Sequence, residues 1–318
     1  MDKRFRWLNK TMLSKNKDKR GDVIHPSLKK EQFFNFLFNK LLLVSGVIVI
    51  LIIIFMLLIL FIASYPAIKK FGIGFFFSNV WDYRSNNYGA LSFIAGTVLT
   101  SFLAILISLP FSLSIAILLS TYLKKGFISN FIKTTTELLA GIPSIIYGFW
   151  GFYFLGPIVK NIAKSFGIID ATGYGILTSS IILSIMIIPY TASISREVLE
   201  LVPTDLIEAG LSLGSTKYKI VTKIMFPYAL SGIFAGVILS LGRALGETMA
   251  VTMLIGNRNQ IPKNLFDTGN TIASVIANQF GEAVGIQSAT LIELGFILMV
   301  ITVVVNFTGK YIINKFKV

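Results

Sequence analysis

Two opposite charges stand inside one long apolar segment of the sequence. Arg243 and Glu247 lie within residues 228–255, which have the length and composition of a single membrane-spanning helix. A charged side chain in the bilayer is costly and marks a functional candidate by default. Because the two residues are four positions apart, a continuous helix places them on one face, where they can pair. We therefore expect Glu247 to hold Arg243 until an anion takes its place.

Small residues share the face of Arg243. At 100° per residue, that face also carries Gly232, Gly236, Ser240, Ala250 and Leu254. Such a stripe lets another helix or a solute come close. The charged pair then either pins two helices together or forms a charged point on a solute pathway. We favour the pathway, since a guanidinium can bind an oxyanion through two hydrogen bonds.

A third carboxylate, Glu293, falls near the start of the last predicted span, residues 289–307. Either it lies at the outer interface in contact with water, or it orients Arg243 from the neighbouring helix. Both interpretations stay open from the sequence alone.

The composition indicates a membrane protein that catalyses no bond change itself. Of 318 residues, 54% are apolar and 14% charged, and the apolar residues come in runs of about 20 or more. There is no cysteine, and the one histidine, His25, lies in a polar tail. We find no Ser/His/Asp set, metal cluster, carboxylate dyad or G-x-x-x-x-G-K-[ST] pattern. The sequence therefore predicts a chain that binds no metal or cofactor, and energy must come from a partner or an ion gradient.

The sequence predicts an all-α polytopic membrane protein with six transmembrane helices. Their ranges are 41–62, 91–119, 138–159, 176–190, 228–255 and 289–307. With the N-terminus inside, the inner segments hold 21 and the outer segments 7 of the 29 lysines and arginines. Both termini are therefore expected in the cytoplasm, and topology rather than nucleic-acid binding explains the net charge of +14. Pro110, Pro143 and Pro189 are expected to kink these helices rather than end them.

Two regions outside the spans keep alternative interpretations. Residues 1–40 form a basic cytoplasmic tail ahead of the transmembrane domain, residues 41–318. Within the tail, residues 33–38 form either a short interfacial helix or an extension of the first span. The outer loop 64–90 is rich in aromatic residues, which belong to an interfacial belt or to a surface for an extracytoplasmic partner.

The cytoplasmic loop 192–227, between the fourth and fifth predicted spans, contains a predicted pair of short helices. Pro203 or Thr204 can begin the first helix, and Gly214 can end it. Ser215 or Thr216 can cap the second helix, which Pro227 is expected to separate from the fifth span. An apolar side on the first helix indicates that it sits in a groove of another protein.

This loop resembles the EAA loop of ABC importer permeases. The matching positions are Glu208-Ala209-Gly210, Gly214, Ile224 and Phe226-Pro227, with Gly210 and Phe226 departing from the usual Ala and Leu. Further stretches are similar to phosphate ABC importer permeases: residues 242–252, 138–148, 187–190 and 293–295. Residues 81–82, 88–91 and 255–257 favour the PstC-type subunit of that family over its PstA-type partner.

The resemblance implies a transport subunit in the cytoplasmic membrane of a prokaryote. It would work with a PstA-type second permease, a PstB-type ATPase dimer that binds the ATP, and an extracytoplasmic PstS-type phosphate-binding protein. The residues implied in ATPase coupling are Glu208, Ala209, Gly210 and Gly214, and no partner is a nucleic acid. The alternatives are a permease for sulfate or molybdate, an ion-coupled secondary transporter using Arg243, Glu247 and Glu293, and a membrane scaffold or sensor.

Overall fold

The computed structural model describes residues 26–315, which form two compact units divided between Leu57 and Leu58. Most of the predicted basic tail, including His25, lies outside the described residues. The first unit is a single apolar helix, the first part of α2 (Pro26–Phe71). Because α2 is continuous through residues 33–38, these residues extend the first span rather than forming a separate interfacial helix.

The described residues are almost entirely helical, which confirms the all-α prediction. Five helices are long and apolar enough to cross a membrane, and a sharply bent pair makes six if it counts as one span. The five are α2, α4 (Leu91–Ile117) with the π-helical turn η1 (Leu118–Tyr122), α8 (Ile176–Glu200), the run of α10 (Lys217–Ile220), η3 (Val221–Met225) and α11 (Phe226–Leu245), and α14 (Ile286–Lys315).

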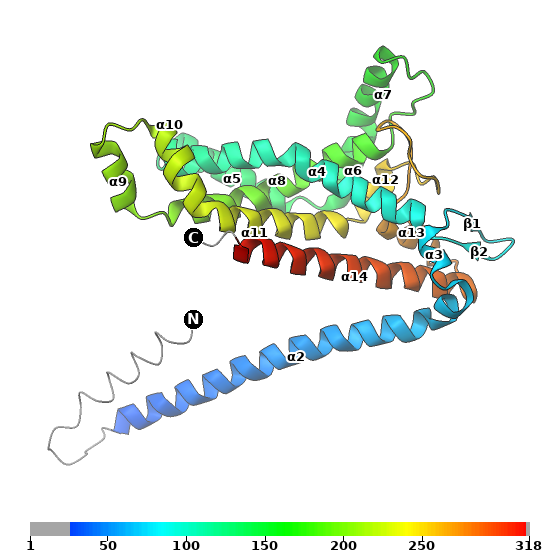
Figure 1. Cartoon of the computed structure of the whole chain (residues 1–318), viewed down its shortest axis with the longest axis horizontal. Coiled ribbons are helices and arrows are strands. Elements are labelled where there is room, and N and C mark those ends of the chain that lie inside the picture. Colours follow the sequence, from blue (N-terminus) through cyan, green and yellow to red (C-terminus); the bar gives the residue numbers. More distant parts are fainter. Residues whose placement is uncertain (1–25, 316–318) are drawn as a thin grey trace. The chain divides into compact units, whose positions relative to one another are not determined.

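Within the second unit, short elements stand at the two ends of the packed helices (Figure 1). One end carries α9 (Thr204–Ser212), and the other carries α3 (Gly74–Phe77), the antiparallel hairpin of β1 (Trp81–Asp82) and β2 (Asn87–Tyr88), and α13 (Ile272–Gln279).

The closest helix pair in the bundle is α4 with α8. Buried small residues recur on α4 at every fourth position: Ser92, Gly96, Thr100, Ala104, Ser108, Ser112 and Ala116. Their spacing forms one stripe along the helix, which lets the two backbones approach. Several hydroxyls bond within their own helix, as Thr100 does to the carbonyl of Gly96 at 2.7 Å. The stripe thus gives close packing with few polar groups left over.

The third predicted span, 138–159, is wrong as a single helix. The chain forms α5 (Phe127–Gly141), then α6 (Ser144–Trp150), the π-helical turn η2 (Gly151–Leu155) and α7 (Gly156–Ser165), with a bend of 95° between α5 and the rest. Pro143 disfavours a helical conformation for Ile142, whose ψ is 127°. Pro143 itself has ψ 136°, so two extended residues separate the helices. Pro110 and Pro189, in contrast, lie inside α4 and α8 as expected.

Pro227 does not separate the second cytoplasmic helix from the fifth span, contrary to expectation. The turn η3 precedes it, and the amide of Phe226 bonds to the carbonyl of Val221, five residues earlier. A π-helical turn accommodates the proline ring and requires no N–H from Pro227. One helix therefore runs from Lys217 to Leu245.

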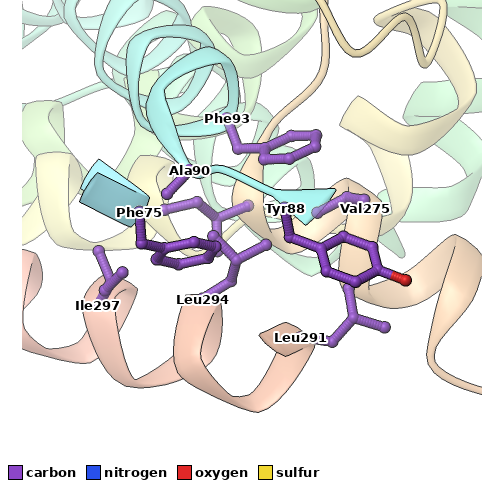
Figure 2. Packing of buried hydrophobic residues seen from close by; sticks show 9 residues of the cluster. Phe75, Tyr88, Ala90, Phe93, Val275, Leu291, Leu294 and Ile297 are labelled. Carbon is purple, nitrogen blue, oxygen red and sulfur yellow. The ribbon is translucent and has the colours of Figure 1, made fainter. Parts of the chain in front are cut away.

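The aromatic outer loop forms a hydrophobic core of its own. The cluster consists of Phe75, Tyr88, Ala90 and Phe93 facing Ile272, Val275, Leu291, Leu294 and Ile297 of α13 and α14 (Figure 2). The ring of Trp81 meets this cluster edge-on, 4.9 Å from Tyr88 and 4.8 Å from Phe93. Part of the loop is thus a buried cap, which neither earlier interpretation included, while Phe77 and Tyr83 stay exposed.

A second outer loop, residues 256–271, is pressed against α4 at Gly96. A Cβ atom at position 96 would collide with the backbone carbonyl of Asn270. Beside it, the hydroxyl of Thr97 accepts a hydrogen bond from the amide of Ile272 at 3.0 Å. The close approach therefore requires glycine, and it holds the loop to the bundle.

Replacing Gly96 by alanine should lower the thermal unfolding midpoint of the detergent-purified protein, at a cost of about 1–3 kcal/mol for overpacking. The matched control is Gly295→Ala, because a Cβ there would be 3.8 Å from the nearest atom, in Ile276. Equal midpoints for the two variants would contradict the close contact between the loop and α4.

Candidate functional site

Arg243 lies in the last turn of α11, where the structure brings together stretches that are far apart in the sequence. Its guanidinium stands over the ring of Tyr190 in α8, 4.5 Å from the ring centroid. The hydroxyl of Tyr190 donates to the carbonyl of Ala140 at 3.5 Å, and that of Tyr147 donates to Leu139 at 2.8 Å. Helices α5, α6, α8 and α11 therefore meet around one cation.

The break before Pro143 explains why this cluster suits a cation. It ends α5 and frees the carbonyls of the last turn, two of which accept hydrogen bonds from the tyrosines. Helix C-termini carry partial negative charge, and Arg243 stands at the end of α11. The contact with Tyr190 contributes about 0.5–2 kcal/mol more. The charge is thus stabilised without a carboxylate, and the exposed fork of Arg243 has no hydrogen-bond partner within residues 26–315.

The expected Arg243–Glu247 ion pair does not form. Among the described residues, the one ion pair within 4.0 Å joins Arg196 and Glu200. The pairing rule requires a continuous helix, but α11 ends at Leu245 and α12 (Met249–Leu254) begins a separate helix. The predicted span 228–255 is therefore broken at residues 246–248, and the half-buried Glu247 belongs to the break.

The small residues of α11 serve helix packing. A Cβ atom at Gly232 would collide with Val198 of α8, and Gly236 and Ser240 are buried on the same side. The hydroxyl of Thr191 in α8 donates to that of Ser240 at 2.7 Å. Of the two uses foreseen for the stripe, the described residues show the approach of another helix.

Glu293 is buried, which contradicts its placement in water at the outer interface. Its side chain lies in α14 and is 3% exposed, and its Oε2 atom has no hydrogen-bond partner among the described residues. No ion pair or hydrogen bond joins it to Arg243 in that part of the chain either. Within the described residues, Glu293 therefore makes no direct bond to Arg243.

The predicted coupling helix is present as α9, at the opposite end of the bundle from the hairpin (Figure 1). Its start after Pro203 and its end before Gly214, which has φ +76°, agree with the sequence prediction. Thr216 caps the second helix by accepting from the amide of Lys219. Glu208 and Ala209 are exposed.

The apolar side of α9 has an exposed part and a part that packs on the neighbouring helix. Leu206 and Leu213 are exposed, 44% and 86% respectively. Gly210 instead faces inward, where a Cβ atom would be 2.9 Å from Ile224 and 3.4 Å from Ile220. The helix therefore packs on its neighbour through Gly210 and presents leucines outward.

Sequence reasoning missed the role of Tyr147 and Tyr190. Both belong to stretches noted for their resemblance, yet neither was assigned a function. A signal was available: a tyrosine four residues after Pro143 and another directly after Pro189 stand where prolines free helix carbonyls.

These features define a class of protein: a helical, multi-span membrane subunit with a helix pair projecting from one end. Residues 108–318 match the family described as binding-protein-dependent transport system inner membrane components. The chain belongs to this family, so it is a multi-pass permease subunit of an ABC importer in the cytoplasmic membrane. Membership implies an ATPase and a substrate-binding protein as partners.

Individual relatives of this chain carry a more specific name than the family does. The chain is 41% identical over 266 residues to the phosphate transport system permease protein PstC of Pasteurella multocida (strain Pm70), covering 79% of this chain and 83% of the relative. It is 38% identical to the probable phosphate transport system permease protein PstC of Methanocaldococcus jannaschii, covering 81% and 86%.

Two solved structures of ABC transporters have a fold similar to that of this chain. A bacterial alginate ABC transporter in complex with a pentasaccharide-bound periplasmic protein aligns with a TM-score of 0.57 at 17% identity, covering 91% of this chain and 98% of that one. The inward-facing MetNI methionine ABC transporter gives 0.54 at 20% identity, covering 72% and 94%.

Replacing Glu293 by glutamine should leave the unfolding midpoint unchanged or raise it, because the change keeps the shape of a buried side chain whose Oε2 atom has no hydrogen-bond partner among the described residues and removes its ability to ionise. Thermal unfolding in detergent at neutral pH measures this. The control is Glu200→Gln, which removes a half-exposed ion pair and should cost under about 1 kcal/mol. A clear loss of stability in Glu293→Gln alone would show that the carboxylate has a favourable partner in the native protein.

Proposed function

We propose that this chain is the transmembrane permease subunit of an ATP-driven importer that carries inorganic phosphate across the cytoplasmic membrane. The observation that carries the proposal is the 41% identity, over four-fifths of the chain, to a phosphate transport system permease protein PstC. The assembly would contain a PstA-type permease, a PstB-type ATPase dimer that binds ATP, and a PstS-type phosphate-binding protein. Both termini and α9 would face the cytoplasm.

The free guanidinium fork of Arg243 supports an anion pathway. The guanidinium carbon lies 4.5 Å from the ring centroid of Tyr190, and the exposed side chain makes no hydrogen bond within the described residues, so its N–H groups are available. These edges match the oxygens of a tetrahedral anion through paired hydrogen bonds, which the point charge of a lysine cannot imitate. Because no carboxylate is bound to Arg243, an arriving phosphate has no partner to displace.

The function is tested by uptake of labelled phosphate into vesicles containing the co-expressed subunits and binding protein. Uptake should require ATP and be lost in Arg243→Lys. Labelled sulfate and molybdate serve as competing anions. Uptake of one of them in place of phosphate, or uptake without ATP, would contradict the proposal.

Glu247 should discriminate between anions. A carboxylate beside the pathway repels a fully ionised sulfate, whereas phosphate near neutral pH carries a proton and can donate a hydrogen bond to it. Glu247→Gln should raise the ratio of sulfate to phosphate uptake by about tenfold or more, which corresponds to about 1.4 kcal/mol. The anions are supplied directly, without the binding protein, because that protein also selects. An unchanged ratio would make Glu247 only a structural residue of the break.

Coupling to the ATPase is assigned to α9, with Glu208, Ala209, Gly210 and Gly214. Gly214 has φ +76°, a conformation that leucine resists and asparagine tolerates. Gly214→Leu should abolish ATP-driven uptake while the chain still inserts, and Gly214→Asn should retain a substantial part. Uptake and co-purification of the ATPase are measured for both. Normal uptake in Gly214→Leu would contradict the docking role of α9.

A further inference from the structure

An open pocket of about 430 Å³ is lined by residues of the hairpin and its neighbours. The hairpin lies at the opposite end of the second unit from α9 (Figure 1). Two aromatic side chains line it, Trp81 and Tyr83, and one carboxylate, Glu282. The remaining lining residues are side-chain amides: Asn259, Asn278, Gln279 and Gln287. The lining residues come from the hairpin, the loop after α12, α13, the turn after α13 that carries Glu282, and the first turn of α14.

The lining has the chemistry of a cation site. Glu282 is exposed, and within the described residues its side chain makes no ion pair or hydrogen bond. A carboxylate attracts a cation, and amide oxygens accept hydrogen bonds from it. Among the described residues no lysine or arginine lines the pocket, although Arg84 lies beside it, over the ring of Tyr83 and bonded to the Tyr83 hydroxyl at 3.2 Å. The hairpin and Glu282 together carry two carboxylates, Asp82 and Glu282, against this one cation, so the charge around the pocket is negative on a chain with a net charge of +14.

The walls of the pocket are fixed before any ligand arrives. The indole N–H of Trp81 donates to Oε1 of Gln279 at 2.9 Å, and Asn270 donates to Oδ1 of Asn259 at 2.9 Å. The hairpin turn is held by Asp82, whose pKa is lowered because its carboxylate accepts hydrogen bonds from the hydroxyl of Ser85 and the amide of Arg84. A preformed wall reduces the cost of ordering on binding.

We propose that this pocket receives a lysine or arginine side chain of the extracytoplasmic binding protein. The inference rests on the proposed function, in which α9 faces the ATPase and the opposite end faces the side from which solute is delivered. An open pocket with a single charge suits a side chain presented by a protein surface better than a small free cation, which binds tightly only where it is enclosed. Glu282 then guides docking and leaves the anion pathway at Arg243 untouched.

The test uses the complete transporter in liposomes and its phosphate-loaded binding protein. The binding-protein concentration that gives half-maximal stimulation of ATP hydrolysis is measured for each variant. Glu282→Gln should raise it about threefold to tenfold, and Glu282→Lys more than about tenfold, because a lost or reversed charge weakens association. The maximal rate at saturating binding protein should stay within about twofold of the wild-type rate.

The matched control is Asp170→Lys. Asp170 is also exposed, but it lines a different pocket together with Arg258 and Lys263. This variant should shift the titration by less than about twofold. Equal shifts for the two lysine variants would show a general effect of surface charge and overturn the pocket, as would an unshifted titration in Glu282→Lys.

The ATP-hydrolysis assay distinguishes failure of the proposed function from failure of the docking pocket. If the wild-type transporter is not stimulated by the phosphate-loaded protein, the proposed function is contradicted. If stimulation is normal but insensitive to position 282, only the docking pocket is wrong.

Discussion

A broken helix inside a membrane must satisfy the carbonyls that the break frees, because the bilayer core contains no water to do so. Here the break lies at Ile142 and Pro143, and the hydroxyls of Tyr147 and Tyr190 supply the missing donors to α5. Tyr190 has a second contact, since its ring face carries the guanidinium of Arg243. The position of the cation therefore depends on the same interaction that makes the break tolerable.

Helix α8 supports this arrangement because it packs on several neighbours at once. It contacts α4, α5, α6 and α11, and 67% of its most apolar stretch is buried inside the structure. The small residues of α4 and α11 let it come close to both, and Thr191, next to Tyr190, bonds to Ser240 of α11. Tyr190 is thus carried on a helix that is packed on several sides, and a site built on packed helices holds its geometry better than one on a loop.

Local signals predicted much of the fold. Length and composition located α4, α8 and α14, and turn and capping residues located α9, Gly214 and Thr216. Proline was less informative, since Pro110 and Pro189 lie within helices while Pro143 follows the end of one. Whether the chain tolerates a helix end at a proline depends on which hydroxyls from other helices can bond the freed carbonyls. That is a property of the tertiary structure.

The sequence predicted Arg243 as a residue of the candidate site, but neither Tyr147 and Tyr190 nor the contacts of the cation. Arg243 was identified from its cost in a membrane, yet the pairing with Glu247 assumed a helix that Gly246 ends. Because that helix stops at Leu245, Arg243 lies in the last turn of the run from Lys217 to Leu245. This run is about 43 Å long at 1.5 Å per residue. Gly210 of α9 packs on Ile220 and Ile224 at the near end of this run. The run from Lys217 to Leu245, which includes the π-helical turn η3, therefore connects the surface on which α9 packs with the turn that places the cation over Tyr190.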